Sequence, residues 1–177
     1  MTHNHKKYLR IIGVSPSGWG FGFAVLDGNN VLVDWDAKTP SKDKNARCIK
    51  EVSKLINLYA PDAMALFDYS AGSKRSLRVQ RLNRRLIVLA KERKIKVELF
   101  TPGKVAQLFF PDGGGTKHDI AKVLADRFLD ELGFRLPPKR ASWMNQDRRM
   151  DIFDAAALAV ATRLREKKAS GPYLATK

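Results

Sequence analysis

Apolar positions along the chain follow the alternation typical of strands in some segments and the spacing typical of helices in others. Together these patterns predict a sheet covered by helices. Residues 8–14 are largely apolar, residues 20–26 form a second apolar run, and residues 31–36 alternate apolar and acidic side chains. These patterns predict three strands at the start of the chain. Residues 27–30 read DGNN, which is typical of a hairpin turn and indicates antiparallel pairing.

The rest of the chain alternates helical and strand periods. In order, we expect a helix at 44–59, a strand at 63–67, a helix at about 74–94, a strand at 96–100, a helix at 116–132, a loop at 133–146 and a last helix at about 148–166. Strands that alternate with helices after a hairpin meander indicate an α/β fold. The predicted sheet is mixed and five-stranded, with three antiparallel strands first, then parallel additions, and helices flanking it.

The chain length is that of one compact domain. We expect this domain to span residues 8–166 of the 177, between a disordered N-terminal segment at 1–7 and a flexible tail at 167–177. The single cysteine, Cys48, excludes an intrachain disulfide and a cysteine zinc cluster. The apolar stretches are of strand length and the start lacks a secretory signal, so we expect a cytoplasmic protein with no membrane contact.

The charge balance is strongly basic. Lys and Arg number 33 against 18 Asp and Glu, a formal net charge of +15. Such an excess repels itself in the folded state and commonly indicates a polyanionic partner, for which nucleic acid is the first candidate. The alternative is a surface that is basic only for solubility.

Two carboxylates stand in an apolar part of the last predicted helix, MDIFDAAALAVA. Asp151 and Asp154 are three residues apart and therefore share a helix face. Burying them is costly, and each raises the pKa of the other, unless a cation neutralises them. A divalent metal ion would do so. The alternative is that they interact with the helix dipole, with Arg148 and Arg149 as partners.

A third carboxylate follows the predicted strand at 63–67. Asp68 ends this apolar run at the edge where a parallel sheet presents its ligands. Many strands end in aspartate, so Asp68 alone is a weak signal. Together with Asp151 and Asp154, however, it could hold two metal ions for phosphoryl chemistry.

At this point the sequence resembles the RuvC-like Holliday-junction resolvases of the RNase H-like superfamily, over about residues 9–163. Their first strand, G-I-D-P-G, is similar to residues 13–17, GVSPS, and the following T-G-x-G/A-V to residues 20–25, GFGFAV. Their last helix, D-x-x-D-A-x-A-L-A-x-A, matches residues 151–161 closely, and their glycine-rich turn before a lysine resembles residues 113–117, GGGTK. Asp68 takes the place of the acid that ends their fourth strand.

The resemblance implies an RNase H-like fold, binding of branched or double-stranded DNA, a homodimer, and cleavage that depends on Mg²⁺ or Mn²⁺. It assigns the metal to Asp68, Asp151 and Asp154, and charge compensation to Lys117. RNA is the second candidate partner, either for an RNA-processing module or for a structural member of a larger complex.

Ser15 departs from the family, which has its first catalytic aspartate at this position. Serine is neutral and a weaker ligand, so the site is one charge short. Three explanations fit: an inactive nucleic-acid-binding protein on the same fold, a reorganised site that uses Ser15 with Asp119 or Asp147, or an engineered substitution that traps a complex.

Basic residues are concentrated in the helix predicted at 74–94. Lys74, Arg78, Arg81 and Arg85 recur at spacings of four, three and four, with Arg75 beside them. A stripe of one sign favours phosphate contacts, which are blind to base sequence. The alternative is a solvated helix face.

Two further segments are candidates for nucleic-acid contact. Backbone amides at Gly114 and Gly115 could bind a phosphate that Lys117 neutralises, although an ordinary helix-start loop fits equally well. In the loop at 133–146 and just after it, Lys139, Arg140 and Arg148 surround Trp143, which we interpret as facing DNA. Trp19, which alternates with Phe21 and Phe23, is expected to pack in the core; the alternative is that it stacks on an exposed base.

Overall fold

A mixed five-stranded sheet forms the centre of the molecule. The computed structural model describes residues 8–70 and 72–171. The strands are β1 (Arg10–Pro16), β2 (Phe21–Asp27), β3 (Leu32–Lys38), β4 (Ala63–Phe67) and β5 (Lys96–Phe100), in the order β3-β2-β1-β4-β5. β1, β2 and β3 are antiparallel, whereas β4 and β5 lie parallel to β1. The predicted fold class is confirmed.

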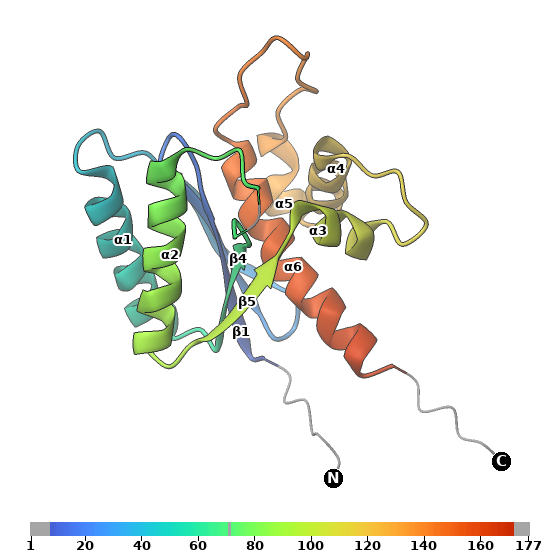
Figure 1. Cartoon of the computed structure of the whole chain (residues 1–177). Helices are drawn as coiled ribbons and strands as arrows, with labels where there is room; N and C mark the ends of the chain where they lie inside the picture. The colour runs from blue at the N-terminus through green and yellow to red at the C-terminus, as the bar shows by residue number, and fades with distance from the viewer. Residues whose placement is uncertain (1–7, 71, 172–177) are drawn as a thin grey trace, which may run out of the picture.

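Helices cover both faces of this sheet (Figure 1). One face carries α1 (Lys44–Tyr59) and α2 (Leu77–Glu92); the other carries α3 (Pro102–Phe109), α4 (Lys117–Arg127), α5 (Leu129–Leu132), the 3₁₀ turn η1 (Gly133–Arg135) and α6 (Met150–Ala169). Side chains of β1 alternate between the two layers, since Ile11 packs with the α6 layer while Ile12 and Val14 pack with the α1 and α2 layer.

Several element boundaries differ from the prediction. β1 begins at Arg10 and continues to Pro16, so Ser15 lies inside the strand. α2 begins at Leu77 because the Ser76 hydroxyl accepts the Val79 N–H as an N-cap, which leaves Lys74 and Arg75 in the segment before the helix.

The helix α3 was missed although its start signals are in the sequence. Thr101 caps it by accepting the Lys104 N–H, and Pro102 occupies its first turn. The helix predicted at 116–132 is two helices, because the backbone at Phe128 leaves the helical region (φ −116°, ψ 60°).

α6 lies directly on the sheet because two glycines leave room for it. A Cβ on Gly13 of β1 would collide with the carbonyl oxygen of Ala155, and one on Gly22 of β2 with that of Asp151. The first turns of α6 are therefore held against the ends of β1 and β2, and this contact determines where the acidic residues of α6 lie.

The predicted end segments are only partly described. Residues 1–7, expected to be disordered, lie outside the described residues, and α6 continues to Ala169, into the segment predicted as a tail. None of the helices in the described ranges is long and apolar enough to span a membrane.

Candidate active site: an acid pair beside a basic cleft

Asp151 and Asp154 lie on one face of α6, in its first and second turns, as their spacing predicted. Their exposed fractions are only 2% and 5%, because these turns pack on β1 and β2. Two carboxylates at such depth need partners inside the protein. Each of them has one.

The partner of Asp151 is Ser17, which follows β1. The Ser17 hydroxyl donates to an Asp151 carboxylate oxygen at 2.5 Å and accepts the backbone N–H groups of Trp19 and Gly20. The Arg78 guanidinium of α2 donates to the carbonyls of Ser17 and Gly18 (2.9 and 3.1 Å), so the 17–20 turn is tied to α2. Ser17 thus fixes the orientation of the Asp151 carboxylate.

The partner of Asp154 is Lys117, the first residue of α4. Its Nζ lies 2.7 Å from an Asp154 carboxylate oxygen and donates to the side-chain oxygen of Gln146 at 2.7 Å. The Lys117 side chain is 41% exposed, so it reaches from solvent to a buried carboxylate. This ammonium neutralises part of the acid pair.

Burial raises the pKa of both carboxyl groups. The pKa of Asp151 rises from 3.8 to about 6, mainly because of desolvation; the Ser17 hydrogen bond opposes this rise and the Asp154 charge adds to it. Burial likewise raises the pKa of Asp154, although Lys117 and, more weakly, Arg75 act in the opposite direction. Any cation that reaches the two carboxylates would therefore stabilise their ionised forms.

Ser15 lies on the face of the sheet that the start of α6 covers. Gly13 and Ser15 share one face of β1, and a Cβ on Gly13 would touch α6. The cross-strand neighbour of Ser15 is Gly22, whose missing Cβ makes room for Asp151. Ser15, 1% exposed, therefore puts a neutral hydroxyl beside the turn that carries the acid pair.

Asp68 stands at the end of β4, as predicted, but its carboxylate is engaged locally. It accepts the Ser70 N–H at 2.9 Å, and its hydrogen bonds with Ser70 hold its pKa below the usual value. Among residues 8–70 and 72–171, no three His, Cys, Asp or Glu side chains lie close enough to hold one metal ion. Asp151 and Asp154 are therefore the two carboxylates that this part of the chain brings together.

A cleft of about 860 Å³ connects Asp68 with Asp154. Its walls come from the segment before α2, the start of α3, the start of α4 and the second turn of α6. Its basic lining residues are Lys74, Arg75 and Lys117. The Arg75 guanidinium lies 6.0 Å from the ring centre of Tyr69, another lining residue, whose pKa is raised to about 12, mainly by burial.

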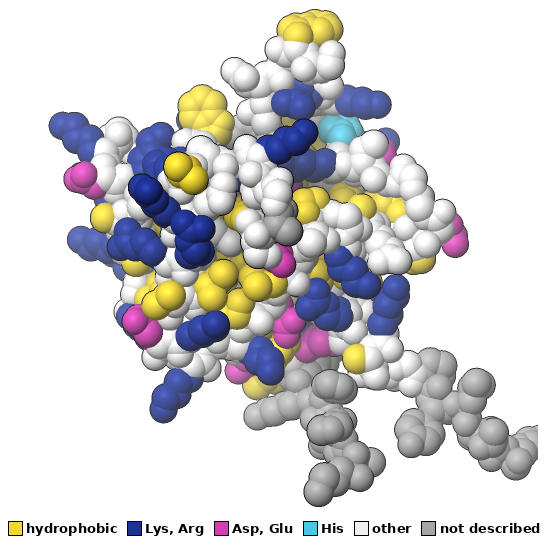
Figure 2. Space-filling model, in the orientation of Figure 1, with side chains coloured by type: hydrophobic (Ala, Val, Ile, Leu, Met, Phe, Trp, Pro, Cys, Tyr) yellow, Lys and Arg dark blue, Asp and Glu magenta, His cyan; other side chains and the backbone are white. Residues whose placement is uncertain are grey.

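The basic residues predicted to form one stripe on α2 differ in their exposure and contacts. Arg81 and Arg85 are exposed on α2, whereas Arg78 is half-buried and turned towards the 17–20 turn. Figure 2 shows basic side chains gathered over α2 and again below the loop that precedes α6. The cationic surface is therefore broad and includes this loop.

The glycine-rich turn leads into α4 with a capping box. Gly113 and Gly114 have positive φ angles (93° and 83°), and Gly115 lies against the Phe110 ring. The Thr116 hydroxyl accepts the Asp119 N–H, while the Asp119 carboxylate accepts from Thr116. Asp119 is thus engaged in capping and does not complete the acid pair.

The loop before α6 brings further predicted residues to the same end of the molecule. Lys139, Arg140 and Arg148 are exposed, and Trp143 is 85% exposed. Asp147, the other candidate to replace the missing acid, binds Arg149 through both carboxylate oxygens (3.0 and 2.7 Å).

The prediction that Trp19 packs in the core is wrong. The turn that carries Trp19 lies outside β2 and leaves the indole half exposed, whereas Phe21 and Phe23 inside the strand are buried.

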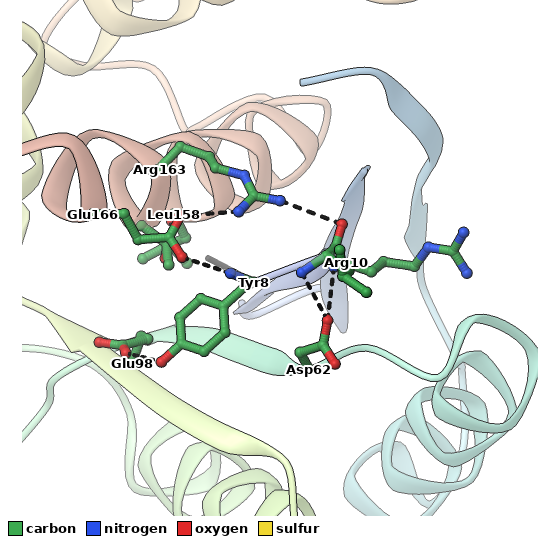
Figure 3. Close-up of polar contacts among 9 residues, drawn as sticks. Tyr8, Arg10, Asp62, Glu98, Leu158, Arg163 and Glu166 are labelled. Carbon is green, nitrogen blue, oxygen red and sulfur yellow. Dashed lines mark hydrogen bonds and ion pairs between the residues drawn. The ribbon is translucent and has the colours of Figure 1, made fainter. Parts of the chain in front are cut away.

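Polar contacts at the opposite ends of β1 and α6 hold these two elements in place (Figure 3). The Tyr8 hydroxyl donates to Glu98 at 2.7 Å, and the Tyr8 N–H donates to Glu166 at 2.8 Å. Arg163 donates to the same Glu166 (2.8 Å), and Asp62 accepts two backbone N–H groups from the chain that enters β1. α6 is thus fixed at both ends.

Solved structures share this arrangement of elements. RuvC of Thermus thermophilus in complex with a Holliday junction substrate matches 92% of this chain and 97% of its own, with a TM-score of 0.66 at 18% identity. The chain has the fold of the RuvC-like resolvases. A second T. thermophilus RuvC structure matches 90% of this chain and 96% of its own, with the same TM-score and identity.

A viral protein shares the RuvC-like fold as well. The Fowlpox virus resolvase, solved in a complex with substrate Holliday junction DNA, matches 89% of this chain and 99% of its own, with a TM-score of 0.55 at 14% identity. No protein-family model and no curated protein sequence matches the chain. The RuvC-like fold predicted from the motifs is confirmed, and it rests on structural likeness.

Three residues of this site were not predicted. Ser17 holds Asp151, Gln146 holds Lys117, and Tyr69 lines the cleft. The signal for Ser17 was its place two residues after Ser15, directly after the same strand. Gln146 could not be found in this way, since its contact depends on the path of a long loop.

Proposed function

We propose that this protein binds branched DNA, foremost four-way junctions, along the basic cleft. The observation that carries the proposal is a cleft lined by Lys74, Arg75 and Lys117 that reaches Asp154 of the buried acid pair, on a RuvC-like fold. The net charge of +15 supports a polyanionic partner. Phosphate contacts of this kind read the shape of DNA rather than its sequence.

Different residues would contact different parts of the DNA. Lys74 and Arg75 would bind phosphates at one wall of the cleft, and the Gly114 and Gly115 amides at the other, while Arg81 and Arg85 extend the surface along α2. Lys139, Arg140 and Arg148 would contact a second arm, since they lie on the loop before α6.

Metal-dependent cleavage is the second candidate function, and the close Asp151–Asp154 pair favours it. The two carboxylates would hold Mg²⁺ or Mn²⁺, which prefer one or two carboxylates together with phosphate oxygens. When bound, such an ion supplies an activated water and stabilises charge at the scissile phosphate. Ser17 would keep Asp151 oriented, and Lys117 would offset charge at Asp154.

Ser15 weighs against efficient cleavage. It is neutral and lies on the sheet face covered by the start of α6, where the resembled family has an aspartate, and the Asp68 carboxylate accepts from Ser70. We therefore propose binding as the main activity, with cleavage limited by the missing charge.

A competition experiment tests the binding proposal. A labelled four-way junction is titrated with protein at fixed salt, with and without Mg²⁺, against unlabelled junction, duplex DNA and RNA. We expect at least tenfold preference for the junction in both conditions. Equal competition by duplex would contradict the proposal, and preference for RNA would replace it with an RNA-binding function.

Cleavage is tested on the same junction in Mg²⁺ and in Mn²⁺ with three proteins: the unchanged chain, Ser15→Asp and Asp154→Asn. Cleavage gained in Ser15→Asp and absent in Asp154→Asn would support a site disabled at Ser15. Cleavage by the unchanged chain that is lost in Asp154→Asn would mean that the site works despite the serine. Homodimerisation and a cytoplasmic location stay predictions, the first measurable by light scattering.

A further inference from the structure

We propose that the indole of Trp143 stacks on an unpaired nucleobase at the branch point of a DNA junction. The proposal rests on the proposed function, because it requires nucleic acid at this end of the molecule. The feature of branched DNA that this chain would recognise is the unpaired base at the branch point.

Trp143 is the most exposed of the large hydrophobic side chains in the described ranges. Its exposed fraction is 85%, and that of the neighbouring Met144 is 48%. Both lie on the loop of residues 136–149, which projects beyond the start of α6 (Figure 1, orange, at the top). Trp143 and Met144 thus form two adjacent exposed hydrophobic side chains that a partner could cover.

The charges around Trp143 select the kind of partner. Lys139 and Arg140 precede it, and Arg148 and Arg149 follow it. The single acidic residue of the loop, Asp147, is bound to Arg149. Figure 2 shows basic side chains beneath the hydrophobic tip. An aromatic side chain among cations suits nucleic acid, since the cations bind phosphates and the ring stacks on a base.

Two consecutive residues of α4 fix both ends of this loop. The His118 ring nitrogen Nε2 lies 3.1 Å from the Pro137 carbonyl oxygen at the beginning of the loop, and Lys117 binds Gln146 near its end. Between them the tip is closed by a hydrogen bond from the Met144 N–H to the Ala141 carbonyl (3.0 Å).

Lys117 also binds Asp154, so the position of Trp143 is linked to the acid pair. DNA stacked on Trp143 would therefore be held in a defined relation to the cleft. Because the loop is fixed before binding, little ordering would accompany the contact.

Branched DNA can expose the face of a base, whereas intact duplex DNA does not. A tryptophan needs a free base face, and inside a duplex both faces of each base are covered by neighbours. At a branch point the pairs that end each arm can unstack and expose a face. Trp143 is therefore expected to increase affinity for junctions and single strands, and not for intact duplex.

The test uses a four-way junction with 2-aminopurine at the branch point and a duplex with the same probe inside. Affinities and probe quenching are measured for the unchanged chain, Trp143→Ala and Trp143→Phe. The matched control is Phe134→Ala, which removes another exposed aromatic ring (73%) outside the loop. A single-stranded oligonucleotide with the probe is included.

We expect Trp143→Ala to lower junction affinity about 5- to 100-fold, within the range known for stacking contacts. Its duplex affinity should change less than twofold, and probe quenching should disappear. Trp143→Phe should keep most of the affinity, and Phe134→Ala all of it. Equal junction affinity of Trp143→Ala and the unchanged chain would overturn the proposal, as would equal losses on junction and duplex.

Two further outcomes separate this proposal from the proposed function. If the unchanged chain does not prefer junctions, the proposed function fails, and quenching on the single strand decides about stacking: loss in Trp143→Ala supports it, and unchanged quenching overturns it. A change of oligomeric state in Trp143→Ala, seen by light scattering, would assign Trp143 to a protein contact and overturn stacking.

Discussion

Lys117 and Asp154 form an ion pair between a partly exposed ammonium and a buried carboxylate. We expect the stability of the fold to depend on this pair. We expect Lys117→Met to lower the free energy of unfolding by about 2 kcal/mol at pH 7.5, because Asp154 loses its counter-ion. The cost is below that of a fully buried pair since water reaches this lysine. Urea denaturation measures it.

The double variant Lys117→Met/Asp154→Asn should recover most of this loss, because it removes the charge as well. Lys122→Met is the matched control on the same helix, since its ammonium lies 3.9 Å from the exposed Asp119, and it should change stability by less than about 0.5 kcal/mol. Additive effects of the two substitutions at Lys117 and Asp154 would contradict the coupling.

Asp151 should make stability depend on pH. Its pKa in the folded protein, about 6, lies above 3.8, so the folded state holds the proton more tightly than the unfolded state. The resulting stabilisation is complete below pH 4 and is lost as pH rises through 6. Relative to Asp151→Asn, the free energy of unfolding should fall by about 2 kcal/mol from pH 4.5 to pH 7.5.

Urea denaturation of both proteins across this pH range measures the difference, which includes the coupling between Asp151 and Asp154. A difference that stays constant with pH would mean that Asp151 is not perturbed. A difference that grows in the opposite direction would mean that Asp151 is stabilised in its ionised form, as by a cation.

The contact between α6 and β1 places the acid pair, and Gly13 makes it possible. Gly13→Ala should lower the free energy of unfolding by about 3 kcal/mol, because its Cβ meets the backbone of Ala155 and cannot be relieved by a side-chain movement. Gly103→Ala is the control: no atom lies within 4 Å of its added Cβ.

Gly103 lies in the first turn of α3, so its replacement by alanine should be neutral or stabilising by up to about 1 kcal/mol. Thermal unfolding compares the two variants. Similar small effects would mean that α6 lies farther from the sheet than the structure places it.

The spacing of apolar residues predicted the helices and strands that pack against the core by one face. It did not predict structure that depends on a capping residue or on contacts between residues far apart in the sequence. The α1 and β4 boundaries follow from repeating apolar positions, whereas α3 is short and its cap was overlooked. Asp151 and Asp154 were found because carboxylates are out of place among alanines. The contact of Arg78 with the 17–20 turn could not be predicted in this way, since it joins residues 60 positions apart.

The molecule has a net charge of +15, so its affinity for DNA should fall steeply with salt. Lys74→Gln, at the cleft, should weaken junction and duplex binding alike and lower the slope of log affinity against log salt by about 0.9 for one lost phosphate contact. Lys167→Gln, at the other end of α6, is the matched control and should leave the slope unchanged.

Fluorescence anisotropy at four salt concentrations gives these slopes. Equal changes in both variants would indicate attraction to the total charge, with no bound path along the cleft. No change in Lys74→Gln would exclude this residue from the phosphate contacts.

Hydrogen–deuterium exchange with and without a four-way junction tests most directly whether branched DNA binds beside the acid pair. Bound junction should protect residues 72–78, 113–118 and 138–149, and leave residues 164–171 at the far end of α6 unchanged. Protection confined to the far end, or none at saturating junction, would contradict DNA binding at this site.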